Sequence, residues 1–197
     1  MPRFAYVNGR YVPHRDASVH IEDRGYQFAD GVYEVAAVAQ GTFVDEELHL
    51  DRLERSLREL RIAMPTSRAN LKLIARELVR RNGLTYGFIY IQVTRGVAPR
   101  NHPFPVGVKP ALVMTTKQLK PPSETVLSQG IGVITTPDLR WKRRDIKSVS
   151  LLPNCLAKQE AVEKGAGEAW LVDGDGTVTE GSATNAWIVT QEGRVVT

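Results

Sequence analysis

The sequence predicts an α+β fold, in which short strands and helices with one apolar face follow one another along the chain. Asn8-Gly9 stands between two runs of aromatic and β-branched residues, which is the strongest short-range signal for a hairpin turn. From 45 to 63, leucines recur three and four positions apart, as on one face of a helix. The 197 residues include 42% hydrophobic and 24% charged ones, a globular composition that excludes disordered and fibrous classes.

Two helices and three strands are predicted after the hairpin. The leucine stripe assigns 45–63 to the first helix, and a second apolar stripe ends before Asn82-Gly83, a typical helix stop. β-Branched and aromatic residues predict strands at 31–38, 87–94 and 110–116. The last two strands flank a proline-rich loop, 95–105, that carries two arginines and a histidine. We expect this loop to be functional, since ordinary connections are shorter.

Pro121-Pro122 mark the best candidate for a domain boundary, because adjacent prolines form a stiff, extended spacer. We therefore divide the chain into a first domain at 1–119, a linker at 120–122 and a second domain at 123–197. In the second domain the pattern predicts a helix at 153–164 and strands at 131–135, 168–172, 177–179, 186–190 and 194–196.

Residue counts and spacing exclude several classes of site. Cys155 is the only cysteine, which rules out an internal disulfide and a zinc site built from cysteines. The four histidines lack the spacing of metal ligands, so no metal site is predicted. The chain also lacks a glycine-rich loop of the P-loop type and the Gly-x-Ser-x-Gly turn of hydrolases.

Neither nucleic acids nor membranes are predicted as partners. Arginines recur every third position from Arg52 to Arg61, but glutamates at 54 and 59 interrupt this basic row and the net charge of the chain is only +4. We therefore interpret the last three arginines, Arg55, Arg58 and Arg61, as part of a solvated helix face. The longest uncharged apolar run, 35–39, is too short to cross a bilayer. Because no apolar targeting region stands at the start, we expect a cytoplasmic protein.

Three segments, in order, carry the most specific signal. Residues 23–34 resemble the N-terminal signature of the fold-type IV (class IV) pyridoxal-phosphate aminotransferases, 145–161 look like their Schiff-base lysine region, and 179–185 look like their cofactor-nitrogen segment. The loop Arg95-Gly96-x-x-x-Arg100-x-His102 is similar to the substrate-carboxylate loop of the branch that acts on D-amino acids. The resemblance runs over nearly the whole chain.

The resemblance implies a small N-terminal α/β domain, a larger β-rich pseudo-barrel domain and pyridoxal 5′-phosphate as the cofactor. Lys147 would hold the cofactor as a Schiff base and move the substrate's α proton, which requires a deprotonated amine. Glu180 would keep the pyridine nitrogen protonated. Arg52 would bind the phosphate, and three residues after Glu180 would lie near the phosphate or the substrate: Ser182, Ala183 and Thr184.

A trap for the substrate carboxylate is implied for Tyr33, Arg100 and His102. A guanidinium holds a carboxylate through two parallel hydrogen bonds, while tyrosine and histidine add directional donors. In the family, the arginine and the histidine reach the site from the neighbouring subunit. The resemblance therefore implies a homodimer with shared active sites, whose substrates are an amino acid and a 2-oxo acid.

The implied reaction is transamination between a D-amino acid, such as D-alanine, and 2-oxoglutarate by a ping-pong Schiff-base mechanism. A branched-chain L-amino-acid transaminase and an aminodeoxychorismate lyase are alternatives on the same fold. Family members continue well past the position that matches residue 197, so we expect an incomplete second domain. We accordingly expect weak or absent activity for the 197-residue chain and the family's activity for a longer parent. An inactive remnant that only binds a partner or dimerises is a further alternative.

Overall fold

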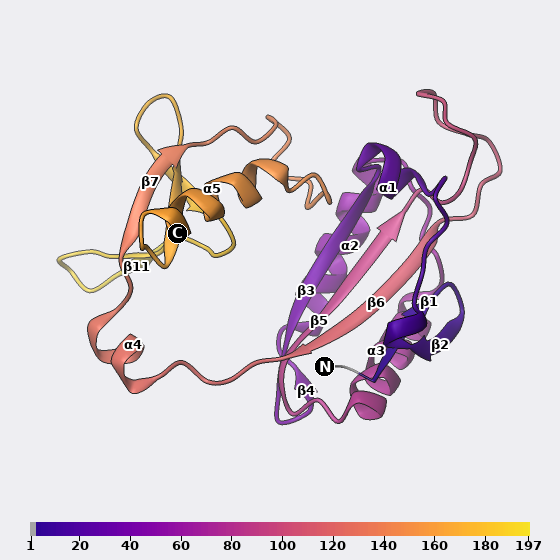
Figure 1. The fold of residues 1–197 in the computed structure, drawn as a ribbon, viewed down its shortest axis with the longest axis horizontal. Helices are drawn as coiled ribbons and strands as arrows, with labels where there is room; N and C mark the ends of the chain where they lie inside the picture. The colour runs from indigo at the N-terminus through magenta and orange to yellow at the C-terminus, as the bar shows by residue number, and fades with distance from the viewer. Residues whose placement is uncertain (1–2) are drawn as a thin grey trace. The chain divides into compact units, whose positions relative to one another are not determined.

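The computed structural model describes residues 3–197, and its contacts divide the chain into two compact units. The first unit contains the chain up to Pro121 together with Asp145–Val149, and the second contains Pro122–Arg144 and Ser150–Thr197 (Figure 1). The sequence assigned Asp145–Val149 to the second domain. The structure groups this segment with the first unit instead, because its backbone pairs with a strand of that unit.

The first unit is built on a six-stranded antiparallel sheet with the strand order β2-β1-β6-β5-β3-β4 (Figure 1). The predicted hairpin is present: Asn8 and Gly9 have φ angles of 45° and 97°, as a tight turn between β1 and β2 requires. β3 pairs with β5 along its whole length. The strands are β1 (Phe4–Val7), β2 (Arg10–Pro13), β3 (Gly31–Ala39), β4 (Thr42–Phe43), β5 (Tyr86–Thr94) and β6 (Ala111–Gln118).

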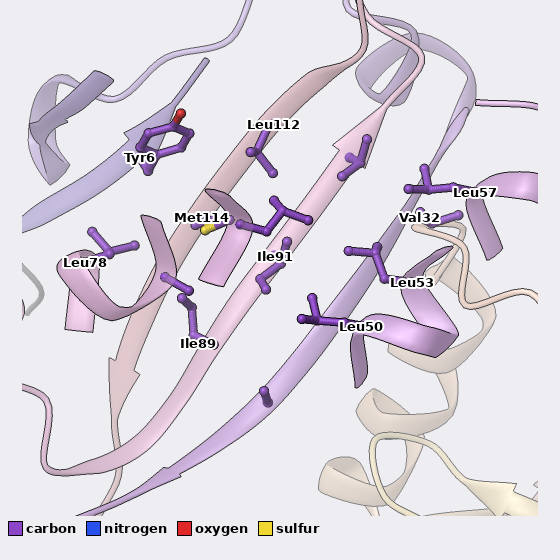
Figure 2. Close-up of a cluster of buried hydrophobic side chains, with 14 of the residues drawn as sticks. Tyr6, Val32, Leu50, Leu53, Leu57, Leu78, Ile89, Ile91, Leu112 and Met114 are labelled. Atoms are coloured by element: carbon purple, nitrogen blue, oxygen red, sulfur yellow. The ribbon is translucent and has the colours of Figure 1, made fainter. Parts of the chain in front are cut away.

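Two helices, α2 (Glu46–Glu59) and α3 (Arg68–Asn82), pack against this sheet. Figure 2 shows the leucines of α2 directed toward β3, as the predicted stripe requires. Gly83, with a φ of 58°, ends α3 at the predicted stop. Burying each large apolar side chain stabilises the fold by about 1.5–3 kcal/mol, so this core fixes the strands. Its largest members are Tyr6, Val32, Leu50, Leu53, Leu57, Ile62, Leu71, Leu78, Ile89, Ile91, Val93, Leu112, Met114 and Ile146.

The second unit contains a three-stranded sheet in which β7 (Val133–Pro137) runs parallel to β8 (Glu168–Val172) and β9 (Val178–Gly181) runs antiparallel to it. α5 (Leu152–Glu163) connects the parallel pair, close to the predicted helix. The buried apolar cluster of the second unit is small and comprises Ala157, Ala161, Ala169 and Leu171. β10 (Ile188–Val189) and β11 (Val195–Val196) form a separate antiparallel pair.

Short helices were not predicted from the sequence. α1 (Arg24–Phe28) and α4 (Glu124–Gln129) have five and six residues, too few to show helical periodicity, and a 3-10 turn covers His14–Asp16. The carboxylate of Asp23 caps α1 by accepting a hydrogen bond from the backbone N–H of Gly25 at 2.8 Å. None of the helices within residues 3–197 has the length and apolar character of a membrane span.

Candidate active site

Lys147 is fixed by its backbone to the first unit. Its carbonyl accepts a hydrogen bond from the N–H of Tyr33 on β3 at 3.0 Å, and its own N–H donates to the hydroxyl of Ser56 on α2 at 3.4 Å. Next to it, Val149 donates its N–H to the carbonyl of Gly31 at 3.1 Å, and the Ile146 side chain is buried in the core. The segment therefore behaves as a short extra strand beside β3.

The amine of Lys147 lies over the ring of Tyr33, which itself stacks on Tyr90. Its Nζ is 4.6 Å from the ring centroid of Tyr33, and Tyr33 stacks on Tyr90 with centroids 5.5 Å apart. The Tyr90 hydroxyl donates to Oε1 of Gln92 at 2.7 Å. Burial, together with the neighbouring Tyr33, raises the pKa of Tyr90 to about 12. The structure thus brings together two of the predicted site residues, Lys147 and Tyr33.

Arg55 contradicts its interpretation as part of a solvated helix face. Its guanidinium donates to the backbone carbonyl of Asp145 and lies 3.5 Å from the Asp145 carboxylate. Arg55 therefore holds the segment that carries Lys147 against α2. Spacing along α2 could not reveal this contact, because the two residues lie 90 positions apart in the sequence.

Arg52 forms a charged cluster with Glu34 and His49. Its Nε and Nη2 donate to the two carboxylate oxygens of Glu34 at 2.6 and 2.8 Å, and Nδ1 of His49 lies 2.8 Å from Oε2 of Glu34. The Glu34 side chain is 1% exposed. Burial raises its pKa, but the hydrogen bonds from Arg52 and His49 outweigh burial and lower it overall. An ionised Glu34 therefore orients the guanidinium predicted to bind phosphate.

Arg100 and His102 lie in the proline-rich loop and meet at one aromatic ring. The guanidinium carbon of Arg100 is 4.5 Å from the ring centroid of Phe28, at the end of α1. The ring of His102 lies 5.5 Å from the same ring, centroid to centroid. The structure therefore brings together these two predicted carboxylate ligands, and both are exposed to solvent.

Glu180, on β9, belongs to an ion-pair network within the second unit. Arg140 donates to its carboxylate and also binds the Asp138 carboxylate, with Nε to Oδ1 at 3.0 Å and Nη2 to Oδ2 at 2.9 Å. Arg144 adds a contact to Asp138 at 2.6 Å. The Asp138 side chain is fully buried, and the hydrogen bonds from Arg140, Thr179 and Arg144 hold its pKa well below the usual range. Arg140 thereby orients Glu180.

The turn after β9 is held by hydrogen bonds to the buried carboxylate of Glu168. The hydroxyls of Ser182 and Thr184 donate to Glu168, the latter at 3.0 Å, and Asn154 donates to the Ser182 carbonyl at 2.9 Å. A Cβ added to Gly181 would come within 2.2 Å of the Thr184 hydroxyl, so the turn needs glycine. Ser182 is buried, whereas Ala183 and Thr184 are exposed. Within residues 3–197, no three His, Cys, Asp or Glu side chains group as a metal site.

A family model for class IV aminotransferases matches residues 31–197. The chain belongs to the class IV aminotransferase family. This assignment confirms the enzyme class and, with it, pyridoxal 5′-phosphate as the family's cofactor. Among curated relatives of this family, the D-alanine aminotransferase of Staphylococcus epidermidis is 43% identical over 185 residues. The match covers 93% of this chain and 65% of that protein, so the chain spans slightly less than two thirds of its relative's length.

Solved structures of class IV enzymes share the fold. A branched-chain amino acid aminotransferase from Escherichia coli matches with a TM-score of 0.85 and 21% identity over 97% of this chain and 66% of that one. The 4-amino-4-deoxychorismate lyase of Pseudomonas aeruginosa matches with a TM-score of 0.74 and 25% identity over 95% of this chain and 67% of that one. The expected α+β fold type is therefore confirmed.

Several partners of the predicted class IV site residues were missed by sequence analysis. They are Glu34 and His49 beside Arg52, Phe28 beside Arg100, and Arg140 beside Glu180. Only His49 gave a signal that could have been used, because it lies three positions before Arg52 and so on the same face of α2. The others come from separate elements, which spacing within one element cannot relate.

Proposed function

We propose that the protein containing this chain is a pyridoxal-phosphate-dependent transaminase that exchanges an amino group between a D-amino acid, such as D-alanine, and 2-oxoglutarate. The observation that carries the proposal is the 43% identity with a D-alanine aminotransferase over 93% of the chain. The proposal includes a homodimer with shared active sites, to which Arg100 and His102 would be contributed by the neighbouring subunit, and a cytoplasmic location.

The side chains present fit the cofactor in their chemistry. Lys147 offers an amine for its aldehyde, Glu180 a carboxylate for its ring nitrogen, and Arg52 a guanidinium for its phosphate. The fit is supported by their surroundings, since Arg140 orients Glu180, and Glu34 orients Arg52. In the turn at Ser182, Ala183 and Thr184, the N–H of Ser182 donates to the Ala169 carbonyl, so the N–H groups of the other two residues would lie near the phosphate or the substrate. When bound, pyridoxal phosphate supplies a ring that accepts electrons from the substrate's α carbon.

Lys147 would carry the proton in this reaction. Its backbone is held by Tyr33 and Ser56, so the amine moves only through rotations of its own side chain. An aromatic face attracts an ammonium group, so the ring of Tyr33 would stabilise the amine once it has taken the α proton. The guanidinium of Arg100 and the imidazole of His102 would bind the substrate carboxylate and thereby select which hydrogen faces the amine.

A spectrum of the cofactor-loaded protein tests this function. D-alanine and L-leucine are added separately, at equal concentrations, and the change in the cofactor absorbance is followed in the wild type and in Lys147→Ala. We expect a change that is at least about tenfold faster with D-alanine and is lost in the variant. The ratio between donors does not depend on the absolute rate, which we expect to be low for the 197-residue chain.

Three other outcomes would overturn the proposal. A faster change with L-leucine would support the branched-chain transaminase, whose fold this chain shares. Release of pyruvate from aminodeoxychorismate, without an amino acceptor, would support the lyase. Identical behaviour of wild type and Lys147→Ala with every substrate would support an inactive remnant that only binds or dimerises.

A further inference from the structure

Asp30, directly before β3, is the centre of a buried charge cluster in the first unit. Its carboxylate accepts hydrogen bonds from Nε of Arg24 at 2.7 Å and from Nε and Nη2 of Arg95 at 2.8 and 3.0 Å. The side chains of Arg24, Asp30 and Arg95 are 4%, 10% and 8% exposed. Burial raises the pKa of Asp30, but the hydrogen bonds from the two arginines outweigh it. Asp30 thus pairs, as an anion, with two guanidinium groups.

Both arginines contact residues of the loop 95–105, which begins with Arg95 and carries Arg100 and His102. Arg24 donates from Nη1 to the carbonyl of Asn101 at 2.5 Å and from Nη2 to the carbonyl of His102 at 3.3 Å. The guanidinium of Arg95 lies 3.6 Å from the ring centroid of Phe104, also in the loop. The three nitrogens of Arg24 therefore connect Asp30 to the backbone of two consecutive loop residues.

Phe28 contacts the same loop through its ring. The guanidinium carbons of Arg24 and Arg100 lie 4.7 and 4.5 Å from its centroid, and the His102 ring is 5.5 Å away. Such contacts attract cations to the ring face. Arg100 is exposed, and fixing a long arginine side chain in one conformation costs rotamer entropy. The contact with the Phe28 ring and the hydrogen bonds from Arg24 to the loop backbone reduce this entropy cost before the substrate binds.

We propose that Arg24 is a positioning residue for the substrate carboxylate. By holding the carbonyls of Asn101 and His102, it determines where Arg100 and His102 present their donors. The inference rests on the proposed function, in which these two side chains bind the carboxylate. In the proposed function these two groups bind the carboxylate and Lys147 moves the proton, so a displaced loop would mainly weaken substrate binding. Arg24 is 3% exposed, so it acts through the loop and not by touching the substrate.

Arg24→Lys tests the inference, because lysine keeps the positive charge near Asp30 but lacks the fork that reaches both carbonyls. We expect the KM for D-alanine to rise at least about tenfold while kcat stays within about twofold. The affinity for pyridoxal phosphate should be unchanged. Arg15→Lys is the matched control, since the Arg15 side chain is 87% exposed and pairs only with Asp16 among the salt bridges of residues 3–197.

Two further readouts separate positioning from a general loss of stability. Amide hydrogen exchange of Gly96 and Ala98, two loop residues whose N–H groups donate hydrogen bonds, should accelerate in Arg24→Lys while exchange of β5 does not, and this measurement needs no activity. In a background that lacks both side chains, Arg100→Ala with His102→Ala, Arg24→Lys should no longer change the KM, because both groups that it positions are gone. If Arg24→Lys does not fold, Arg24→Gln takes its place, with the same expected pattern, because its shorter amide cannot bond Asp30 and both carbonyls at once.

Distinct results would overturn the inference and the proposed function. An unchanged KM and unchanged loop exchange in Arg24→Lys, with an active wild type, would overturn the inference alone. Equal acceleration of exchange in the loop and in β5 would also overturn it, since Arg24 would then stabilise the whole unit. A wild type that does not react with D-alanine would overturn the proposed function, and the loop exchange would then still decide whether Arg24 holds the loop.

Discussion

The two units hold their charged residues in different ways. In the first unit, the cluster of Asp30 and that of Glu34 belong to a fold with sixteen buried core residues. In the second, four small or medium side chains form the buried cluster, and the carboxylate of Asp138 is surrounded by arginines. The backbone around Lys147 therefore rests on a large apolar core. Around Glu180 the apolar core is small, so hydrogen bonds between charged groups contribute a larger share of the stabilisation. Four substitutions test this contrast.

Asp30→Asn should have the largest effect on stability. The substitution leaves the buried guanidiniums of Arg24 and Arg95 without their shared anion, which costs about 3–5 kcal/mol of unfolding free energy. Urea denaturation followed by circular dichroism measures this loss. Asp16→Asn, at an exposed ion pair, is the control and should change the free energy by less than about 0.5 kcal/mol. Equal effects of the two substitutions would remove the basis for a structural role of the cluster.

Arg140→Ala tests the corresponding network of the second unit. Asp138 would lose the partner that contacts both of its oxygens while staying buried, so we expect a local loss of about 3 kcal/mol. Hydrogen exchange of β8 and β9 amides measures it, and β5 amides should keep their protection. Arg194→Ala, whose side chain is 76% exposed, is the control. Acceleration confined to the first unit would contradict the assignment of these ion pairs to the second.

Glu34→Gln should have a smaller, pH-dependent effect on the free energy of unfolding. The Arg52 side chain is 45% exposed, so water can hydrate its guanidinium when the Glu34 carboxylate is absent. We expect a loss of about 1–2 kcal/mol at neutral pH. Because the folded pKa of Glu34 lies below its ordinary value of 4.5, the ionised carboxylate stabilises the fold above about pH 4.5. This stabilisation is lost as the pH falls through the lowered pKa. Urea denaturation of both proteins at neutral pH and about pH 3 should therefore show a difference that shrinks on acidification; a constant difference would contradict the ionised pair.

Tyr90→Phe should have the smallest effect, which is a change in the ultraviolet titration of the tyrosines. Its pKa of about 12 places its ionisation above the ordinary value of 10.0, so the neutral hydroxyl contributes stability that is lost as the pH rises through that range. Ultraviolet titration of the wild type and Tyr90→Phe should differ mainly near pH 12. If the two curves differ only around pH 10, the Tyr90 hydroxyl does not lie in a buried environment.

Local features of the fold were predictable from the sequence. The turn at Asn8-Gly9, the leucine face of α2 and the stop at Gly83 each depend on residues close together in the chain. The three segments that resemble class IV aminotransferases likewise led to the family. α1 escaped prediction because five residues show no periodicity.

The contacts around the site residues were not predictable, because they join distant parts of the chain. Arg55 and Asp145 are 90 positions apart, Arg24 and Asn101 are 77 apart, and Arg140 and Glu180 are 40 apart. Each depends on how strands pair and helices pack, which periodicity does not specify. The same limit explains why the sequence places Asp145–Val149 in the second domain while its contacts group it with the first unit: its pairing partner, β3, lies more than a hundred positions earlier.

The central claim, that Lys147 holds the cofactor, is tested most directly by covalent trapping. The protein is mixed with one equivalent of pyridoxal phosphate, reduced with borohydride and digested, and the labelled peptide is identified by mass spectrometry. In the wild type we expect a single major label, on Lys147. In Lys147→Ala we expect no lysine to be labelled to a comparable extent. A label spread over other lysines, unchanged by Lys147→Ala, would contradict the claim.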